Sequence, residues 1–196
     1  MRPSAFSAFL LLAIGFVSTL QAQASDRSGA PADEFSLAVK MDQNDQGGSA
    51  SATIRIHATR EVLWRILTSC GEALQIVPGL KVCTVEETGP NLSWQRIHQV
   101  MDYSWYVPRV SYEVKANYVT PERIAFEKVA GDSMRLRGSW KVESDGEYSV
   151  AHYDVEFAPG FWVPHWYVRF ALQRDLPKML RSLRGHAEAA QSSWAG

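Results

Sequence analysis

Apolar residues alternate with polar or small residues in two early segments, and a period of two is typical of half-buried β-strands. The segments are residues 35–41, FSLAVKM, and residues 50–56, ASATIRI. The residues between them, 42–48, read DQNDQGG and have the composition of a turn. We therefore predict that the folded part of the chain opens with a β-hairpin.

A helical period follows the hairpin. The apolar residues of 60–69, REVLWRILTS, recur at spacings of three and four, and Thr59 is a suitable N-cap for this helix. A second short helix is predicted over 72–77, and it ends before the helix-breaking pair Pro78 and Gly79.

Strand patterns then occupy the chain up to residue 157. Turn-forming groups separate them, and the sequence SDGE at 144–147 is a strong hairpin signal. The predicted strands are residues 81–87, 92–101, 106–118, 123–129, 133–143 and 148–157.

The last part of the chain predicts a long amphipathic helix. Pro164 suits its first turn, and an apolar stripe runs from Val168 to Ala187. Pro177 interrupts the stripe, so either the helix kinks there or Asp175 caps a second helix. Such a helix would cover the apolar face of a curved antiparallel sheet, which is an α+β fold. A gap between helix and sheet could hold a ligand.

Residues 1–24, MRPSAFSAFLLLAIGFVSTLQAQA, have a different character. Arg2 precedes an apolar run at 8–17, and a small-x-small cleavage site at 22–24 follows it, as in a secretory signal peptide. A transmembrane anchor is the alternative, but the run is short against the ~20 residues that span a bilayer. We therefore expect an exported, periplasmic protein with a mobile leader at 25–34, a domain at 35–190 and a tail at 191–196.

Export changes the interpretation of the two cysteines, Cys70 and Cys83. In an oxidising compartment an even pair indicates a disulfide, and closing a loop of this size contributes ~3 kcal/mol in the chain-entropy description. Two buried thiols are the alternative.

Composition excludes several classes of protein. The hydrophobic fraction is 46% and the charged fraction 21%, which is too apolar for a disordered chain. A formal net charge of -1 gives no reason to expect nucleic-acid binding. The seven Trp indicate a large core or an aromatic-lined pocket.

Two segments resemble a known superfamily. Residues 60–83 read REVLWRILTSCGEALQIVPGLKVC, and residues 138–188 read GSWKVESDGEYSVAHYDVEFAPGFWVPHWYVRFALQRDLPKMLRSLRGHAE. They are similar to the first-helix region and to the last hairpin and helix of START-like (SRPBCC) proteins, also called polyketide cyclase/dehydrase and lipid transport proteins. The likeness is to their exported, coenzyme Q-binding-like bacterial branch, although Leu63 here separates the usual Val-Trp pair.

The resemblance implies a helix-grip fold, in which a curved antiparallel sheet wraps around a long C-terminal helix. Members of the superfamily bind lipids, sterols, quinones, polyketides or plant hormones, and a minority are enzymes. Fold alone does not select among these functions.

Strand parity indicates which side chains face a pocket. In 133–143 the even positions are apolar and include Met134 and Trp140, whereas the odd positions are largely charged. The inward positions of the neighbouring strands include Tyr112 and Tyr153 by the same reasoning. We therefore take these four residues as candidate ligand contacts.

In 92–101 the even face carries Arg96 and His98. If that face is the inner one, both would recognise a polar headgroup or carboxylate at the end of an apolar ligand, because a buried Arg needs a partner. A shift of register by one residue would put both side chains outside, and this alternative stays open.

Further aromatic residues gather in two predicted loops. Trp105 and Tyr106 lie between strands, and Trp162 and Trp166 lie at the entry to the last helix. They would form a gate to the cavity or touch a membrane. The alternative is that they plug the end of the core.

These observations favour an exported, monomeric binding protein that holds a lipid, isoprenoid or similar hydrophobic molecule. A cyclase/dehydratase-type enzyme using His98, Tyr153 or Asp102 is the alternative, as is a protein-interaction module. The standard catalytic signatures and metal-ligand spacings are absent from the sequence, and no cofactor or metal is expected. Membrane contact is expected to be transient at most, because no basic amphipathic helix is evident.

Overall fold

The structure is a computed structural model that describes residues 35–42, 47–103, 108–132, 134–160, 163 and 165–194. Contacts divide the chain into two units, residues 1–30 and 31–196, and every described residue belongs to the second. The predicted signal peptide and leader lie outside the described residues.

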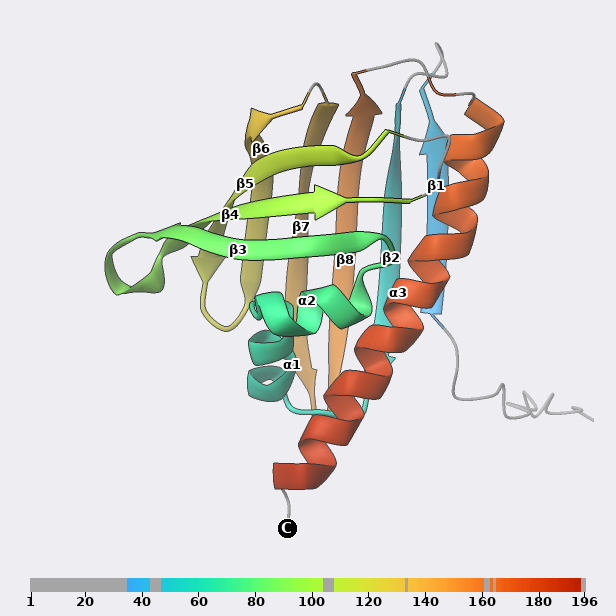
Figure 1. The fold of residues 1–196 in the computed structure, drawn as a ribbon. Helices are drawn as coiled ribbons and strands as arrows, with labels where there is room; N and C mark the ends of the chain where they lie inside the picture. Colours follow the sequence, from blue (N-terminus) through green and yellow to red (C-terminus); the bar gives the residue numbers. More distant parts are fainter. Residues whose placement is uncertain are drawn as a thin grey trace, which may run out of the picture. The chain divides into compact units, whose positions relative to one another are not determined.

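Eight antiparallel strands form one curved sheet, in the order β1-β2-β8-β7-β6-β5-β4-β3 (Figure 1). The α+β helix-grip prediction is therefore confirmed. The strands are β1 (Phe35–Met41), β2 (Gly48–Ile56), β3 (Leu80–Thr88), β4 (Trp94–Met101), β5 (Val110–Val119), β6 (Arg123–Gly131), β7 (Met134–Asp145) and β8 (Tyr148–Pro159).

Two short helices connect β2, which lies next to the edge strand β1, to β3, which forms the other edge of the sheet. They are α1 (Arg60–Leu67) and α2 (Cys70–Ile76). The Thr59 hydroxyl accepts a hydrogen bond from the backbone N–H of Val62 at 3.5 Å, so the predicted N-cap of α1 is confirmed. A 3₁₀ turn at Pro90–Leu92 precedes β4, which begins two residues later than the sequence analysis places it.

A single long helix, α3 (His165–Trp194), crosses the open side of the sheet (Figure 1). Pro177 lies within it, so the sequence does not divide here into two helices. The helix continues to Trp194, past residue 190, where the sequence analysis ends the domain.

The C-terminal half of α3 is anchored in the core. Leu180, Leu183 and Ala187 are almost fully buried, together with apolar residues of β2 and α1. Before Leu176, none of the described residues of α3 is buried. The helix is therefore held mainly at its C-terminal end.

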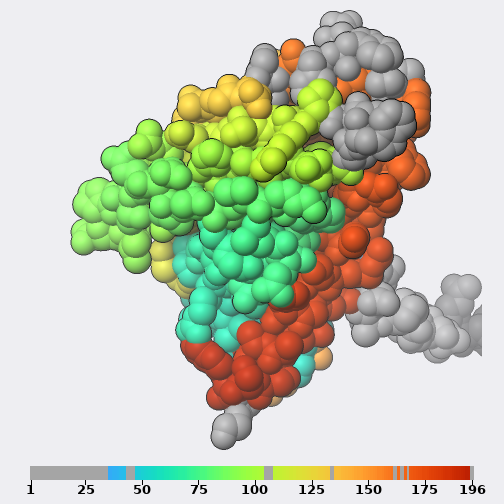
Figure 2. All heavy atoms as spheres, viewed as in Figure 1, coloured from blue at the N-terminus to red at the C-terminus, as the bar shows by residue number. Residues whose placement is uncertain are grey.

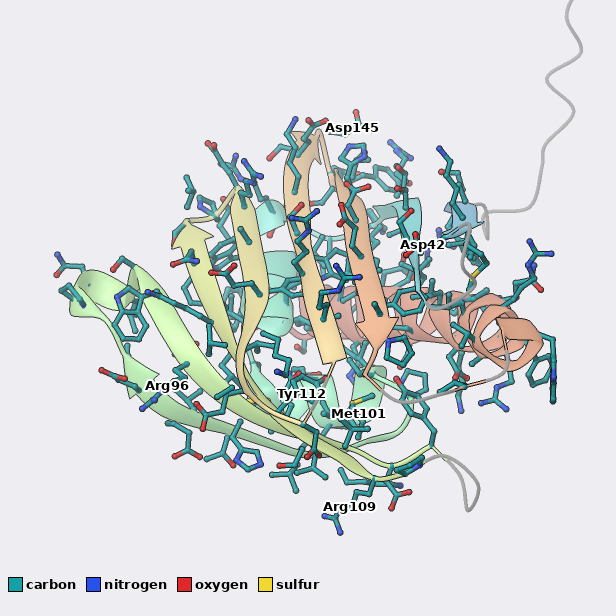
Figure 3. All side chains as sticks on the ribbon, turned by 90° about the horizontal axis from the view of Figure 1, so that it is seen from above. Asp42, Arg96, Met101, Arg109, Tyr112 and Asp145 are labelled. Atoms are coloured by element: carbon teal, nitrogen blue, oxygen red, sulfur yellow. A yellow bond between two sulfur atoms is a disulfide. The ribbon has the colours of Figure 1, made fainter. Side chains whose placement is uncertain are left out.

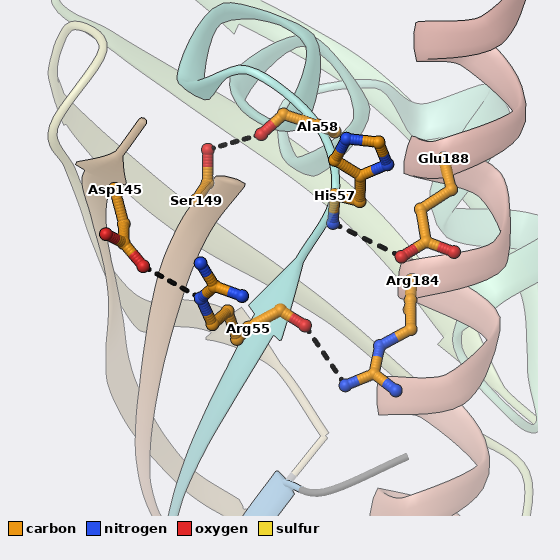
Figure 4. Close-up of polar contacts among 7 residues, drawn as sticks. All are labelled: Arg55, His57, Ala58, Asp145, Ser149, Arg184 and Glu188. Carbon is orange, nitrogen blue, oxygen red and sulfur yellow. Dashed lines mark hydrogen bonds and ion pairs between the residues drawn. The ribbon is translucent and has the colours of Figure 1, made fainter. Parts of the chain in front are cut away.

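Polar contacts reinforce this anchor at the end of β2 (Figure 4). The Arg184 guanidinium donates to the backbone carbonyl of Arg55 at 3.0 Å, and the backbone N–H of His57 donates to Glu188 at 3.2 Å. The fully buried Ser149 hydroxyl donates to the carbonyl of Ala58 at 2.7 Å, which satisfies both groups.

The predicted disulfide is confirmed. It joins Cys70, the first residue of α2, to Cys83 on β3, and the two Cα atoms are 5.3 Å apart. Because β3 is an edge strand, the bond fastens α2 to the rim of the sheet.

Replacing both cysteines (Cys70→Ser with Cys83→Ser) should lower the free energy of unfolding by ~3 kcal/mol, because the unfolded chain loses its cross-link. Urea denaturation of the oxidised wild type and the double variant measures the difference. Reduced wild type is the control and should match the variant, whereas an unchanged midpoint for both would contradict the prediction.

Candidate ligand-binding site

A cavity of about 420 Å³ lies between the inner face of the sheet and the helices. Its described lining is mostly aliphatic and aromatic and comes from α1, α2, α3 and strands β3 to β8. Side chains of α2, α3 and β3 form one continuous surface on the side shown in Figure 2. Before Leu176, the described residues of α3 that line the cavity are Val168, Ala171, Leu172 and Asp175.

Three aromatic rings form a stack along the inner face of β6, β7 and β8. The ring of Tyr153 stacks on Trp140 at a centroid distance of 4.3 Å and on Phe126 at 6.4 Å. Gly138 makes room for this stack, since a Cβ atom there would lie 2.6 Å from the Cζ atom of Phe126. A side chain at Gly138 would therefore collide with the Phe126 ring in its present position.

Tyrosine hydroxyls supply much of the polarity in the cavity. Tyr118 donates to the Gln95 side-chain oxygen at 2.8 Å, whereas the hydroxyls of Tyr112 and Tyr153 have no hydrogen-bond partner among the described residues. Burial raises the pKa of Tyr118 to about 12 and raises those of Tyr112 and Tyr153 further. All three therefore remain protonated hydrogen-bond donors at neutral pH.

The described lining carries one ionised side chain, Asp175, and no Lys, Arg or His. Two nitrogens of Arg174 donate to the Asp175 carboxylate at 2.8 and 3.1 Å. The charge of this carboxylate is therefore balanced at the cavity wall.

Three predicted site residues, Tyr112, Trp140 and Tyr153, line the cavity. Their contact with a ligand stays a prediction. Strand parity placed all three on the inner face because β5, β7 and β8 each have one face that is mainly apolar and one that is not.

The prediction that Arg96 and His98 project into the concavity is wrong. Arg96 lies on the outer side of the sheet, where it pairs with Glu87 at 3.2 Å and Glu113 at 3.6 Å, while Tyr112 lies within the curve (Figure 3). The His98 ring nitrogen Nε2 lies 3.2 Å from the Ser111 hydroxyl oxygen, and His98 is not part of the cavity lining.

The physical reason is the register of β4. Ile97 pairs with Val114 and Gln99 with Tyr112, so the odd positions of β4 share the inner face with the even positions of β5. Leu92, the first even position of the predicted strand, belongs to the 3₁₀ turn and is 63% exposed. Gln99 lines the cavity and was missed, although pairing to Tyr112 would have identified it.

The remaining aromatic candidates lie elsewhere. Trp105, Tyr106 and Trp162 fall outside the described residues, as does the side chain of Met134 on β7. Trp166 is 63% exposed at the start of α3 and does not plug the core.

The proposed acid–base residues are not gathered in one place. Of His98, Asp102 and Tyr153, only Tyr153 lines the cavity, and its raised pKa makes it a poor base. No group of three or more potential metal ligands occurs within the described residues. None of the described helices is both long enough and apolar enough to cross a membrane.

Sequence comparison identifies one family. The family model described as polyketide cyclase / dehydrase and lipid transport matches residues 56–184, which is more than half of the chain. No curated protein matches the sequence significantly.

Solved structures with the same fold include lipid-transfer and cyclase proteins. A STAR-related lipid transfer protein fragment from Xanthomonas axonopodis superposes with a TM-score of 0.68 at 15% identity, covering 81% of this chain and 95% of that one. Human STARD10 gives 0.64 at 10% identity, with 82% and 74% covered. The Zhui aromatase/cyclase from a Streptomyces species gives 0.59 at 14% identity, with 79% and 94% covered.

Alkaline titration should reveal the buried tyrosines. Folding raises the pKa of Tyr112, Tyr118 and Tyr153 above the ordinary value of 10. The stability that these protonated tyrosines give to the fold is therefore complete below pH 10, and it is lost as the pH rises through their pKa values in the folded protein. We expect the phenolate absorbance of Tyr118 to appear only near pH 12, and that of Tyr112 and Tyr153 at higher pH or on unfolding. Tyr118→Phe should remove one phenolate from that late step alone, whereas titration of all seven tyrosines near pH 10 would contradict the assignment.

Proposed function

Because the chain belongs to the polyketide cyclase / dehydrase and lipid transport family, we propose that it holds a hydrophobic small molecule, such as a lipid or isoprenoid, in the cavity between sheet and α3. The observation that carries the proposal is the cavity of about 420 Å³ with its mostly apolar lining. Pockets of this size and composition are typical of small-molecule sites.

Burial of apolar ligand surface supplies the affinity. Removing that surface from water yields ~25 cal/mol per Å² before the costs of association. The stack of Phe126, Tyr153 and Trp140 presents a preformed apolar wall, so little side-chain ordering accompanies binding.

A binding role fits the residues better than catalysis. Neighbours in fold include both a lipid transfer protein and an aromatase/cyclase, so the fold by itself leaves both open. The described lining offers tyrosine hydroxyls and one carboxylate already bonded to Arg174, but no acid–base pair.

We propose that the protein is exported to the periplasm. The pattern of residues 1–24 supports this compartment, and so does a disulfide between Cys70 and Cys83, since such bonds persist in oxidising surroundings.

We propose further that α3 makes transient contact with an anionic membrane. The N-terminal half of the helix exposes two aromatic residues, Trp166 at 63% and Phe170 at 51%, next to the wall that it contributes to the cavity. The sequence pattern did not indicate a basic amphipathic helix, but in the structure exposed basic side chains lie along the part of α3 that follows Trp166. They are Arg169, Lys178 and Arg181, whereas Arg174 is paired with Asp175.

This arrangement suits a membrane surface. Aromatic side chains insert at the boundary between headgroups and acyl chains, and basic side chains attract anionic lipids. Contact at this end of α3 would bring the cavity wall next to the source of a hydrophobic ligand.

Filling the cavity tests the binding function. Ala116 lies on the inner face of β5, so Ala116→Phe should place a ring in the cavity and reduce the retained ligand by roughly tenfold or more. The readout is native mass spectrometry of protein incubated with a lipid extract. The control is Ala125→Phe, on the outer side of the neighbouring strand β6, which should retain as much ligand as the wild type. Equal retention by both variants, or no uptake by the wild type, would contradict the proposal.

Membrane contact is tested separately. Trp166→Ala combined with Phe170→Ala should weaken association with phosphatidylglycerol-containing vesicles by roughly tenfold, because the inserted aromatic surface is lost. Vesicle sedimentation measures the change at low and high salt. Trp194→Ala, at the opposite end of the same helix and also exposed, is the matched control and should sediment like the wild type. If both variants sediment alike, α3 does not contact the membrane through its N-terminal end.

A further inference from the structure

We infer that the ligand of the cavity carries an uncharged polar end, and that the hydroxyls of Tyr112 and Tyr153 bind this end as hydrogen-bond donors. The inference rests on the proposed function and specifies the chemical class of its ligand. This class of ligands comprises ketones, quinones, alcohols and esters with an apolar body, and it excludes carboxylates and phosphates.

The two hydroxyls form a polar spot within an apolar lining. Tyr112 comes from β5 and is 5% exposed, and Tyr153 comes from β8, on the far side of β6 and β7. Both side chains line the same cavity, which is otherwise mostly apolar. Two strands that are not neighbours in the curved sheet thus each contribute one donor to the same cavity.

Neither donor is used by the protein among the described residues. Both hydroxyls line the cavity among mostly apolar groups, where the low local dielectric makes a hydrogen bond to a ligand atom stronger than one to a hydroxyl on the outer surface. Tyr118 differs, because its hydroxyl already donates to Gln95 at 2.8 Å. Tyr112 and Tyr153 therefore each present a hydroxyl that a ligand can use.

The charges around the cavity decide between a neutral and an anionic end. The described lining contains no Lys, Arg or His that would pair with an anion, and Arg174 is bonded to Asp175. An unpaired ion in this apolar space would lose its hydration without compensation. Arg96 and His98, which would have favoured a carboxylate, lie outside the lining.

A pair of ligands with one chain length provides the test. Delipidated protein is titrated by calorimetry with 1-dodecanol and with dodecanoic acid, from about pH 6 to pH 9. The alcohol should bind at least about tenfold more tightly at pH 8 and with constant affinity, because the tyrosines stay protonated throughout. The acid should lose about tenfold in apparent affinity per pH unit above its pKa, because only its neutral form enters.

Variants assign the effect to the hydroxyls. Tyr112→Phe with Tyr153→Phe keeps both rings and should weaken dodecanol binding roughly fivefold, without affecting dodecane. Tyr148→Phe is the control, since Tyr148 lies outside the cavity lining and packs on Arg55. Each single variant provides the same comparison if the double variant does not fold.

The outcomes separate this inference from the proposed function. Equal or tighter binding of the acid at pH 8, or a double variant that binds dodecanol like the wild type, would overturn the neutral end group and leave a hydrophobic binding protein. Failure of dodecanol, dodecanoic acid and dodecane alike, together with no uptake from a lipid extract, would overturn the proposed function itself.

Discussion

The attachment of α3 at one end only is the constraint on which the rest of the structure depends. Leu180, Leu183 and Ala187 fill the curve of the sheet, and hydrogen bonds to the end of β2 hold the same half of the helix. Before Leu176 the helix has no buried side chain among its described residues, so this part covers the sheet without filling it. The cavity is the space that this unequal packing leaves, and no separate domain is needed to create it.

The inner face of the sheet then determines the shape of that space. Phe126, Tyr153 and Trp140 lie against one another across three strands, which is possible because Gly138 has no side chain to hold the Phe126 ring away. On the opposite rim, the disulfide holds α2 against β3. One wall is thus stiffened by stacked rings and the other by a covalent bond, so that the cavity persists between packed elements.

Much of the fold could be predicted from the sequence, because its signals are local. Alternation identified the strands, Thr59 marked the start of α1, and the apolar stripe identified α3. Tyr112, Trp140 and Tyr153 were placed correctly since their strands have one clearly apolar face. In β4 both faces mix polar and apolar residues, so its orientation depends on pairing with β5, which no single strand encodes. That register is why Arg96 and His98 were placed on the wrong face and Gln99 was missed.

The same register explains why the described strands contribute no charged side chain to the cavity lining. Alternation along a strand sends each charged residue to the face opposite its apolar neighbours, and here Arg96, Arg137 and Lys141 all form ion pairs with acidic residues on exposed surface. Such exposed pairs contribute little stability. Their more important effect is to keep the charges of the sheet outside, because turning any of these strands over would bury an ion. The described part of the sheet therefore contributes polarity without charge to the cavity, and tyrosine combines a large apolar ring with one donor that stays protonated when buried.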